Sequence, residues 1–117
     1  MIRESRRSPL AGAAAFEAVL RSGRRRDGDY LQVIAMAAAR DRGRAGFVIG
    51  RKALPRAVDR NRIRRMLRVA LREACPAIDA YDLIVRLKRR APRADFPLLV
   101  TEVVQLLGDL APRQDAP

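Results

Sequence analysis

The strongest hydrophobic periodicity in the chain lies between residues 55 and 74 and predicts an amphipathic helix. Its apolar positions recur at intervals of 0, 3, 4, 7, 8 and 11 residues: Ile63, Met66, Leu67, Ala70, Leu71 and Ala74. Because an α-helix turns about 100° per residue, these side chains share one side of the helix. Pro55 suits the first helical turn, and Pro76 ends the helix. The opposite side is left for solvent or for a partner.

Two more helices are predicted, one on each side of this central one. The first is expected over 9–22, with Ser8 as the capping residue, Pro9 at the first helical position and Gly23 at the stop. Its apolar face holds Phe16, Val19 and Leu20. The last helix is expected to begin after Asp95, which can cap it. It turns six residues inward: Phe96, Leu99, Val103, Leu106, Leu107 and Leu110.

Three short hydrophobic runs predict strands at 30–37, 46–50 and 82–86. The second strand is expected to lie antiparallel to the first across a loop, and residues 24–29 are expected to form a charged turn. The element order α-β-β-α-β-α indicates an α+β fold, a two-layer sandwich with a short sheet. The 117 residues make one domain, with flexible tails expected at 1–8 and 111–117.

Positive charge is concentrated on the central helix and on the segment before it. The chain carries a net charge of +12, and residues 51–72 hold nine basic side chains and a single acid, Asp59. On the helix, the side opposite the core carries Asn61, Arg64, Arg65, Arg68 and Arg72, with Arg60 and Arg62 on its flanks. Arg51 and Lys52 follow the second strand and extend the same patch.

An ordinary solvated helix face is the simplest interpretation of this patch, but two observations count against it. Its arginines are not paired with glutamates four residues away. Like charges at 60, 64, 68 and 72 repel one another along the helix, which implies an absent anion. A rigid array of guanidinium groups on a small domain indicates a polyanion as partner, and a structured nucleic acid is the leading candidate.

Several functions are disfavoured by what the chain lacks. It has no histidine and one cysteine, Cys75, at the predicted helix end, so no internal disulfide and no self-sufficient nuclease centre is indicated. Cys75 is expected to be inert. No window approaches the roughly 18 apolar residues of a membrane span, and the N-terminal segment makes a poor signal peptide. We expect a soluble, intracellular protein.

The segment 60–68 resembles the signature of the bacterial ribonuclease P protein subunit. It reads Arg60-Asn61-Arg62-Ile63-Arg64-Arg65-Met66-Leu67-Arg68. Upstream, residues 44–52 are similar to that family's strand and its following basic pair, Arg51-Lys52, and Ala57-Val58 fits the segment before the signature. The resemblance extends in register to Phe16, Val19, Leu20 and Gly23, and to residues 82–86. Together these segments span most of the predicted domain.

The resemblance implies a cytoplasmic protein that joins a large catalytic RNA, which cuts precursor tRNA to make the mature 5′ end. The central helix and the segment before it would dock on this RNA through Arg51, Lys52, Arg56, Arg60, Asn61, Arg62, Arg64, Arg65, Arg68 and Arg72. Magnesium ions would be held mainly by the RNA, so no catalytic residue and no metal ligand is expected in the protein. No obligate protein partner is implied. The family also implies a left-handed β-α-β crossover through the central helix.

A cleft between the first helix and the sheet would hold the single-stranded 5′ leader of the substrate. The resemblance assigns to it Phe16, Leu20, Tyr30, Val33 and Arg86. The family often has aromatic residues where this chain has Leu20 and Val33, so leader binding is expected to depend more on apolar contact and charge. For Phe16 and Tyr30, plain core packing is the alternative interpretation.

Three other functions share part of this pattern. Another structured-RNA-binding protein, such as a ribosomal protein, would share the arginine face but need not combine Arg51-Lys52 with Arg60-Asn61-Arg62. A DNA-binding helix-turn-helix needs a second helix after a short turn, where this chain has a predicted strand. A membrane-surface helix would carry Trp or Phe on its apolar face, whereas Ile63, Met66 and Leu67 are typical of a core.

Overall fold

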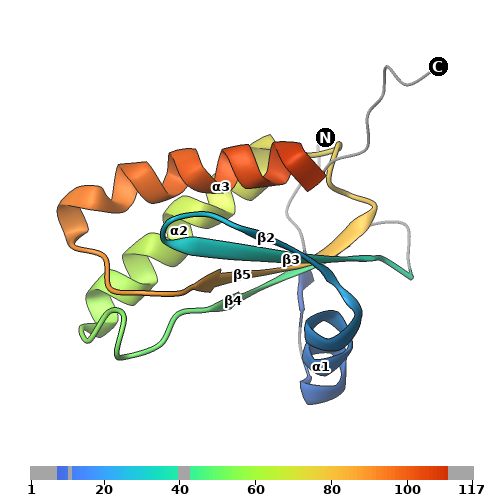
Figure 1. Ribbon diagram of the computed structural model, residues 1–117, viewed down its shortest axis with the longest axis horizontal. Coiled ribbons are helices and arrows are strands. Elements are labelled where there is room, and N and C mark those ends of the chain that lie inside the picture. The colour runs from blue at the N-terminus through green and yellow to red at the C-terminus, as the bar shows by residue number, and fades with distance from the viewer. Residues whose placement is uncertain (1–7, 11, 40–42, 111–117) are drawn as a thin grey trace.

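The computed structural model describes residues 8–10, 12–39 and 43–110, which form one sheet with helices on both faces (Figure 1). Its strands are β1 (Ser8–Pro9), β2 (Arg24–Asp27), β3 (Leu31–Ala37), β4 (Arg44–Val48) and β5 (Tyr81–Leu87). Its helices are α1 (Ala13–Ser22), α2 (Ala57–Glu73), the short 3₁₀ helix η1 (Arg93–Asp95) and α3 (Phe96–Leu110). Helices α2 and α3 lie on one side of the sheet and α1 on the other (Figure 1). The predicted α+β fold is confirmed.

The strands lie in the order β1-β4-β5-β3-β2. β3 runs antiparallel to β2 and β5, whereas β4 runs parallel to β5 and β1. The strands predicted at 30–37 and 46–50 are therefore not neighbours across a loop, because β5 lies between them. Leu83, Ile84 and Val85 of β5 are each 0% exposed, and a strand buried on both faces takes a central place in its sheet. The adjacent parallel pair β4 and β5, joined through α2, has the arrangement that the expected crossover requires.

Alternation along the strands separates two hydrophobic cores. On β3, Val33 belongs to the core beneath α2 and α3, whereas its neighbour Ile34 belongs to the core beneath α1. Successive residues of a strand point to opposite faces, and Ile84 of β5 lies opposite Ile34 in register. The buried residues of α2 and α3 are among those that the periodicity predicted: Ile63, Leu67, Ala70, Leu71, Phe96, Leu99, Val103, Leu106, Leu107 and Leu110.

The first helix begins later than the sequence predicts, at Ala13. Ser8–Pro9 form β1 and pair with the start of β4, so they are not the cap and first turn of a helix. The Leu10 N–H then donates to the Ala45 carbonyl oxygen at 2.9 Å. Gly12 turns the chain into α1 with a φ of 93°, a conformation that favours glycine. Pairing with β4 gives backbone N–H and C=O groups of residues 8–10 their hydrogen-bond partners. If these residues were helical, the edge of β4 would lose this pairing.

The charged turn predicted at 24–29 is mostly a strand. Arg24–Asp27 form β2, which pairs with β3 at the edge of the sheet. Charged side chains are typical of edge strands, and they leave no hydrophobic alternation by which the strand could be recognised. The turn itself is shorter and is closed by the Gly28 N–H, which donates to the Leu31 carbonyl oxygen at 2.8 Å.

The remaining boundaries differ little from the prediction. α2 starts at Ala57, so Pro55 precedes the helix and does not enter its first turn. Asp95 ends η1 immediately before α3. Of the flexible tails predicted at 1–8 and 111–117, residues 1–7 and 111–117 lie outside the described residues, and Ser8 belongs to β1. Within the described part of the chain, none of the helices combines the length and apolar character that crossing a membrane requires.

Candidate RNA interface

Helix α2 presents its basic side to solvent. Ile63, Leu67 and Leu71 are buried, whereas Asn61, Arg62, Arg65, Arg68 and Arg72 are exposed on the other side of the helix. Arg64 is half-buried, and its Nη1 donates to the Asn61 Oδ1 at 3.2 Å. This bond orients the Asn61 amide with its NH₂ group available to donate outward. The arc predicted from periodicity is therefore a real surface.

Arg68 lies where this basic surface meets the sheet. Its guanidinium carbon is 5.4 Å from the centroid of the Phe47 ring on β4. A guanidinium within about 6 Å of a ring is attracted to its face. The contact places the Arg68 charge at the boundary between α2 and β4.

The segment between β4 and α2 adds three more cations. Arg51, Lys52 and Arg56 are exposed, whereas Ala53 and Leu54 between them are buried. The Leu54 N–H donates to the Gly50 carbonyl oxygen at 3.0 Å and closes the turn. Two buried side chains thus anchor a turn whose charged residues face solvent beside the N-terminus of α2.

Arg60 differs from the other arginines of the predicted set. It is half-buried, and its Nη1 donates to the carbonyl oxygens of Leu54 at 2.7 Å and Pro55 at 2.9 Å. These are contacts within the protein, made to the turn that carries Arg51 and Lys52. Helical periodicity placed Arg60 on the flank of the basic arc, but it could not reveal this role.

A second polar contact fixes the N-terminal turn of α2 from the other side. Asp59 accepts from Arg93 of η1, with 2.8 Å between Asp59 Oδ1 and Arg93 Nη2. The Asp59 side chain is only 14% exposed, and a carboxylate in the first turn is favoured by the helix dipole. The single acid of the segment 51–72 therefore ties α2 to the loop before α3.

On the other face of the sheet, Phe16 and Leu20 of α1 are half-buried. They pack against the core that contains Val19, Ile34 and Ile84. A Cβ at Gly46 would lie 2.5 Å from the Phe16 Cζ, so the ring rests directly on the β4 backbone. Phe16 therefore packs in this core, as the alternative interpretation of this residue expected, and part of its side chain remains exposed.

Two residues of the predicted leader set lie elsewhere. Val33 is 0% exposed and faces α2 and α3, so the prediction that it contacts a leader is wrong. Its position on the strand directs it to the opposite face from α1. Tyr30 packs against that same larger core, and its hydroxyl donates to the Asp95 Oδ2 at 2.9 Å. The Arg89 guanidinium lies 4.5 Å from the Tyr30 ring centroid.

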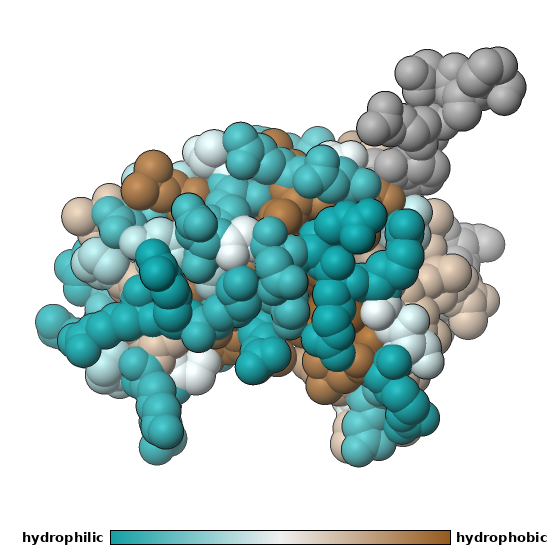
Figure 2. Space-filling model, in the orientation of Figure 1, coloured by the Kyte–Doolittle hydropathy of each residue, from teal (hydrophilic) through white to brown (hydrophobic). Residues whose placement is uncertain are grey.

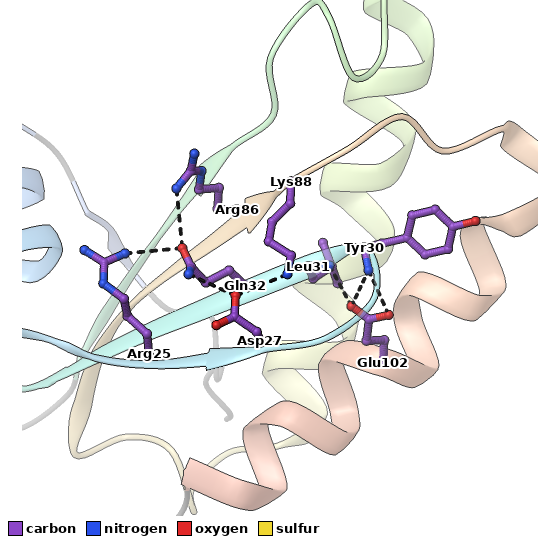
Figure 3. Close-up of polar contacts among 8 residues, drawn as sticks. All are labelled: Arg25, Asp27, Tyr30, Leu31, Gln32, Arg86, Lys88 and Glu102. Atoms are coloured by element: carbon purple, nitrogen blue, oxygen red, sulfur yellow. Dashed lines mark hydrogen bonds and ion pairs between the residues drawn. The ribbon is translucent and has the colours of Figure 1, made fainter.

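Arg86, the fifth predicted leader residue, is exposed and belongs to a row of polar side chains across the sheet (Figure 3). The register places Arg86 of β5 opposite Gln32 of β3, and Gln32 opposite Asp27 of β2. Two cations lie next to these three residues: Arg25, which bonds Gln32, and Lys88, which bonds Asp27. We call these five residues the Gln32 row: Arg25, Asp27, Gln32, Arg86 and Lys88.

Hydrogen bonds connect the Gln32 row. The Gln32 Oε1 accepts from Arg25 at 3.3 Å and from Arg86 at 3.5 Å, and its Nε2 donates to Asp27 at 3.0 Å. Lys88 donates to the same Asp27 oxygen at 3.2 Å. This hydrogen bond, more than any other interaction, lowers the pKa of Asp27 below its ordinary value of 3.8. Arg25 also donates from Nη2 to the Leu20 carbonyl oxygen at 2.5 Å, which joins the row to α1.

Sequence reasoning missed Arg25, Asp27, Gln32 and Lys88 as site residues. Recognition of β2 as a strand would have placed Arg25 and Asp27 on the same face as Gln32, because alternate residues of a strand share a face. The strand was not recognised because all four residues of β2 are charged, which is typical of a turn.

In the orientation of Figure 1, hydrophilic side chains cover most of the visible surface, with only small hydrophobic patches (Figure 2).

The described residues hold no group of three or more His, Cys, Asp or Glu side chains placed to bind a metal ion. The donors that line both candidate faces are mainly guanidinium groups, which bind anions and cannot ligate a cation. Cys75 is half-buried, and its Sγ donates to the Leu71 carbonyl oxygen at 3.5 Å. The guanidinium groups on the basic side of α2 and on the α1 face of the sheet are suited to binding phosphates on two separate faces.

Comparison with known proteins decides the family. A sequence profile described as Ribonuclease P matches residues 5–111. The chain belongs to the ribonuclease P protein family. The ribonuclease P protein component of Acidothermus cellulolyticus is 41% identical over 104 residues, which cover 86% of each chain. That of Synechococcus sp. is 39% identical over 103 residues, 84% of this chain and 77% of the relative.

Solved structures of ribonuclease P proteins share the fold. The protein from Staphylococcus aureus superposes with a TM-score of 0.73 at 20% identity, over 89% of this chain and 97% of that one. The protein from Thermotoga maritima gives a TM-score of 0.71 at 23% identity, over 94% of this chain and all of that one. As a ribonuclease P protein component, the chain works with an RNA subunit in tRNA 5′ processing.

Proposed function

We propose that this ribonuclease P protein divides its two binding tasks between the two faces of its sheet. The basic side of α2, with Arg51, Lys52 and Arg56, docks on the catalytic RNA. The α1 face, with Phe16, Leu20 and Arg86, holds the 5′ leader of precursor tRNA. The RNA subunit cleaves the phosphodiester bond, and the protein needs no further protein subunit. The complex works in the cytoplasm.

The observation that carries this proposal is the separation of the two surfaces. Arg62, Arg65 and Arg72 are exposed on α2, whereas Phe16 and Leu20 of α1 pack against the core on the other face of the sheet. The helices α2 and α1 lie on opposite sides of the sheet (Figure 1). The larger core, which includes Val33, fills the space between the sheet and α2. One molecule can therefore contact a large RNA and a separate single strand at the same time.

The residue types on each face match the two kinds of RNA. Structured RNA has a deep, narrow major groove, so proteins bind it through phosphates, 2′-hydroxyls and shape. Arginines at helical spacing on α2 can reach several phosphates, with Asn61 able to bond a sugar hydroxyl or a base edge. A single strand exposes its bases, and a ring such as Phe16 beside cations suits stacking with backbone contacts.

Magnesium belongs to the RNA subunit in this proposal. Mg²⁺ prefers oxygen ligands in octahedral geometry, commonly carboxylates, phosphates and water. The candidate faces offer mainly guanidinium groups, and Asp27 and Asp59 are already paired with Lys88 and Arg93. The protein side chains therefore hold and orient the RNA strands, while the metal supplies its chemistry among RNA phosphates.

The docking role is tested by charge reversal on α2 with a matched control. The double variant Arg65→Glu, Arg68→Glu is expected to keep its helical circular dichroism but lose binding to the catalytic RNA in a gel-shift assay. The control Arg21→Glu, Arg24→Glu changes the same charge on α1 and β2 and is expected to bind normally. If about five phosphates are contacted, the logarithm of wild-type affinity should fall with that of salt with a slope of about −3.5 to −4.5. A slope near zero, or undiminished binding by the α2 variant, contradicts the proposal.

The leader role is tested with precursor tRNAs that differ only in leader length. Phe16→Ala is expected to weaken the binding and cleavage of long-leader substrates more than those with a one-nucleotide leader. Leu98→Ala, which removes an exposed side chain on α3, serves as the control. Equal losses on both substrates would count against leader binding on the α1 face, without affecting the docking role.

A further inference from the structure

The Gln32 row occupies the part of the α1 face next to α1 itself. Arg25 bonds the Leu20 carbonyl oxygen at the end of α1, so the row continues the surface formed by Phe16 and Leu20. Arg25, Arg86 and Lys88 are exposed, and Gln32 is half-buried between them. With Asp27 as its one acid, the row carries three positive charges and one negative charge.

The orientation of the Gln32 amide follows from its neighbours. An amide side chain has a donor end and an acceptor end. Asp27 can only accept at neutral pH, so it takes the NH₂ end, and Lys88 holds Asp27 in place. The Gln32 oxygen must then point the other way, toward Arg25 and Arg86 (Figure 3). A series of hydrogen bonds across β2, β3 and β5 thus brings the guanidinium groups of Arg25 and Arg86 to the Gln32 Oε1.

The bonds to that oxygen are long, at 3.3 Å from Arg25 and 3.5 Å from Arg86. Charge-assisted hydrogen bonds between guanidinium and phosphate are shorter and about twice as strong as bonds between neutral groups. A phosphate oxygen can therefore replace the amide as the acceptor for both arginines. Before a phosphate binds, the neutral Gln32 amide holds the two positive charges of Arg25 and Arg86 close together and neutralises neither of them.

We propose that Arg25 and Arg86 form a phosphate-binding site for the backbone of the single-stranded leader, with Gln32 as the residue that positions them. This inference rests on the proposed leader function and adds a backbone contact to it. The ligand class is an RNA phosphodiester, because the donors are guanidinium groups held at one point, which recognise an anion and carry no base-specific pattern. The site offsets the lack of an aromatic ring at Leu20, because charge replaces part of the stacking.

Two substitutions of Gln32 separate positioning from charge. Gln32→Glu places a carboxylate between the arginines, which pairs with both and occupies the site. Both variants also lose the amide donor to Asp27, so the difference between them reports the effect of the added carboxylate. It is expected to lower holoenzyme affinity for a long-leader precursor by about tenfold or more, which is the scale of one missing charged hydrogen bond. The salt slope for that substrate should also decrease in magnitude by about 0.7 for each phosphate that is no longer bound. Gln32→Leu leaves both arginines charged but removes the oxygen that positions them. A smaller loss of affinity for the long-leader precursor, about threefold, is expected, with little change in the salt slope.

Gln105 provides the matched control, because it is exposed on α3. Gln105→Glu and Gln105→Leu repeat the same chemical changes away from the α1 face, and are expected to bind long-leader precursors as the wild type does. All four variants are compared on precursors with long and one-nucleotide leaders, and their unfolding temperatures are measured. A general folding defect would weaken both substrates equally, whereas loss of the phosphate site lowers the ratio of long-leader to short-leader affinity.

The outcomes distinguish this inference from the proposed function. If Phe16→Ala loses long-leader affinity but Gln32→Glu matches the wild type, the phosphate site is wrong and the leader role stands. If the wild-type holoenzyme binds long and short leaders equally well, both the leader role and the phosphate site are wrong. A lowered ratio for Gln32→Glu, with an unchanged ratio for Gln105→Glu, supports the site.

Discussion

The Arg60 guanidinium donates from Nη1 to the Leu54 carbonyl oxygen at 2.7 Å, and so connects the first turns of α2 to the segment before it. Arg62, two residues along the helix, is exposed on the opposite side. The two arginines of the Arg60-Asn61-Arg62 signature therefore have different environments. One stabilises the turn that carries Arg51 and Lys52, and the other faces solvent where RNA can dock.

This difference predicts opposite effects of the same substitution. Arg60→Gln is expected to destabilise the fold by about 1–3 kcal/mol, because two backbone carbonyls lose a charged donor. Arg62→Gln should leave stability within about 0.5 kcal/mol but reduce the magnitude of the salt slope for RNA binding by about 0.7–0.9. Urea unfolding and gel-shift titrations over a range of salt measure both quantities. A salt slope that falls equally in the two variants would show that Arg60 contacts RNA directly.

The close approach of Phe16 to Gly46 predicts a steric effect on stability when position 46 is enlarged. A methyl group at position 46 would overlap the ring at 2.5 Å, so Gly46→Ala should cost about 1–3 kcal/mol. Gly50→Ala is the control, since a Cβ there meets nothing within 4 Å. Combining Gly46→Ala with Phe16→Leu should restore part of the stability in thermal unfolding. No recovery in the double variant would mean that the ring is not what the methyl group displaces.

Removal of the Glu102 carboxylate on α3, which lies away from the basic side of α2, is expected to lower the stability of the fold. Its Oε2 accepts from the Tyr30 N–H at 2.9 Å and from the Leu31 N–H at 2.6 Å (Figure 3). Glu102→Ala removes the acceptor for two part-buried donors and should cost about 1–3 kcal/mol. Glu73→Ala, at an exposed position on α2, should change the free energy of unfolding by less than about 0.5 kcal/mol. Similar values for the two variants would argue against this anchoring role.

The Asp27–Lys88 contact predicts a pH response in the Gln32 row. Because the hydrogen bond from Lys88 lowers the pKa of Asp27 below 3.8, the contact stabilises the fold above pH 3.8, and this stabilisation disappears as the pH falls through the lowered pKa. Lys88→Met should raise the pKa of Asp27 in a carboxyl NMR titration, whereas Lys52→Met should leave it unchanged. An Asp27 pKa that does not respond to Lys88→Met would exclude this pair as the cause.

Local patterns predicted the elements that bury a face. Ile63, Leu67 and Leu71 repeat at helical spacing, and Phe96 through Leu110 do the same, so both long helices were found with nearly correct ends. The elements that were missed, β1 and β2, contribute few side chains to the core. Their existence depends on pairing with β4 and β3, which are distant or separated by a turn, and no periodicity records such pairing.

The candidate sites divide in the same way. The exposed arc of α2 follows from helix geometry alone, because positions three and four residues apart must share a side. The leader face required the sheet order and register. Val33 and Ile34 are both hydrophobic, and nothing local shows which of them faces α1. The placement of β5 beside β3 brings Arg86 to Gln32, 54 residues away in the chain.

The amino-acid sequence by itself determined the family, the α+β class and the cationic side of α2, because each follows from motifs, element order and periodicity that can be recognised without knowing which segments pair in space. The tertiary structure alone decided that Arg60 bonds the backbone before α2, that Val33 is buried and that Gln32 stands between two arginines. The physical reason is that strand order, register and side-chain hydrogen bonds are set by non-local packing, in which burial and backbone pairing outweigh local preference.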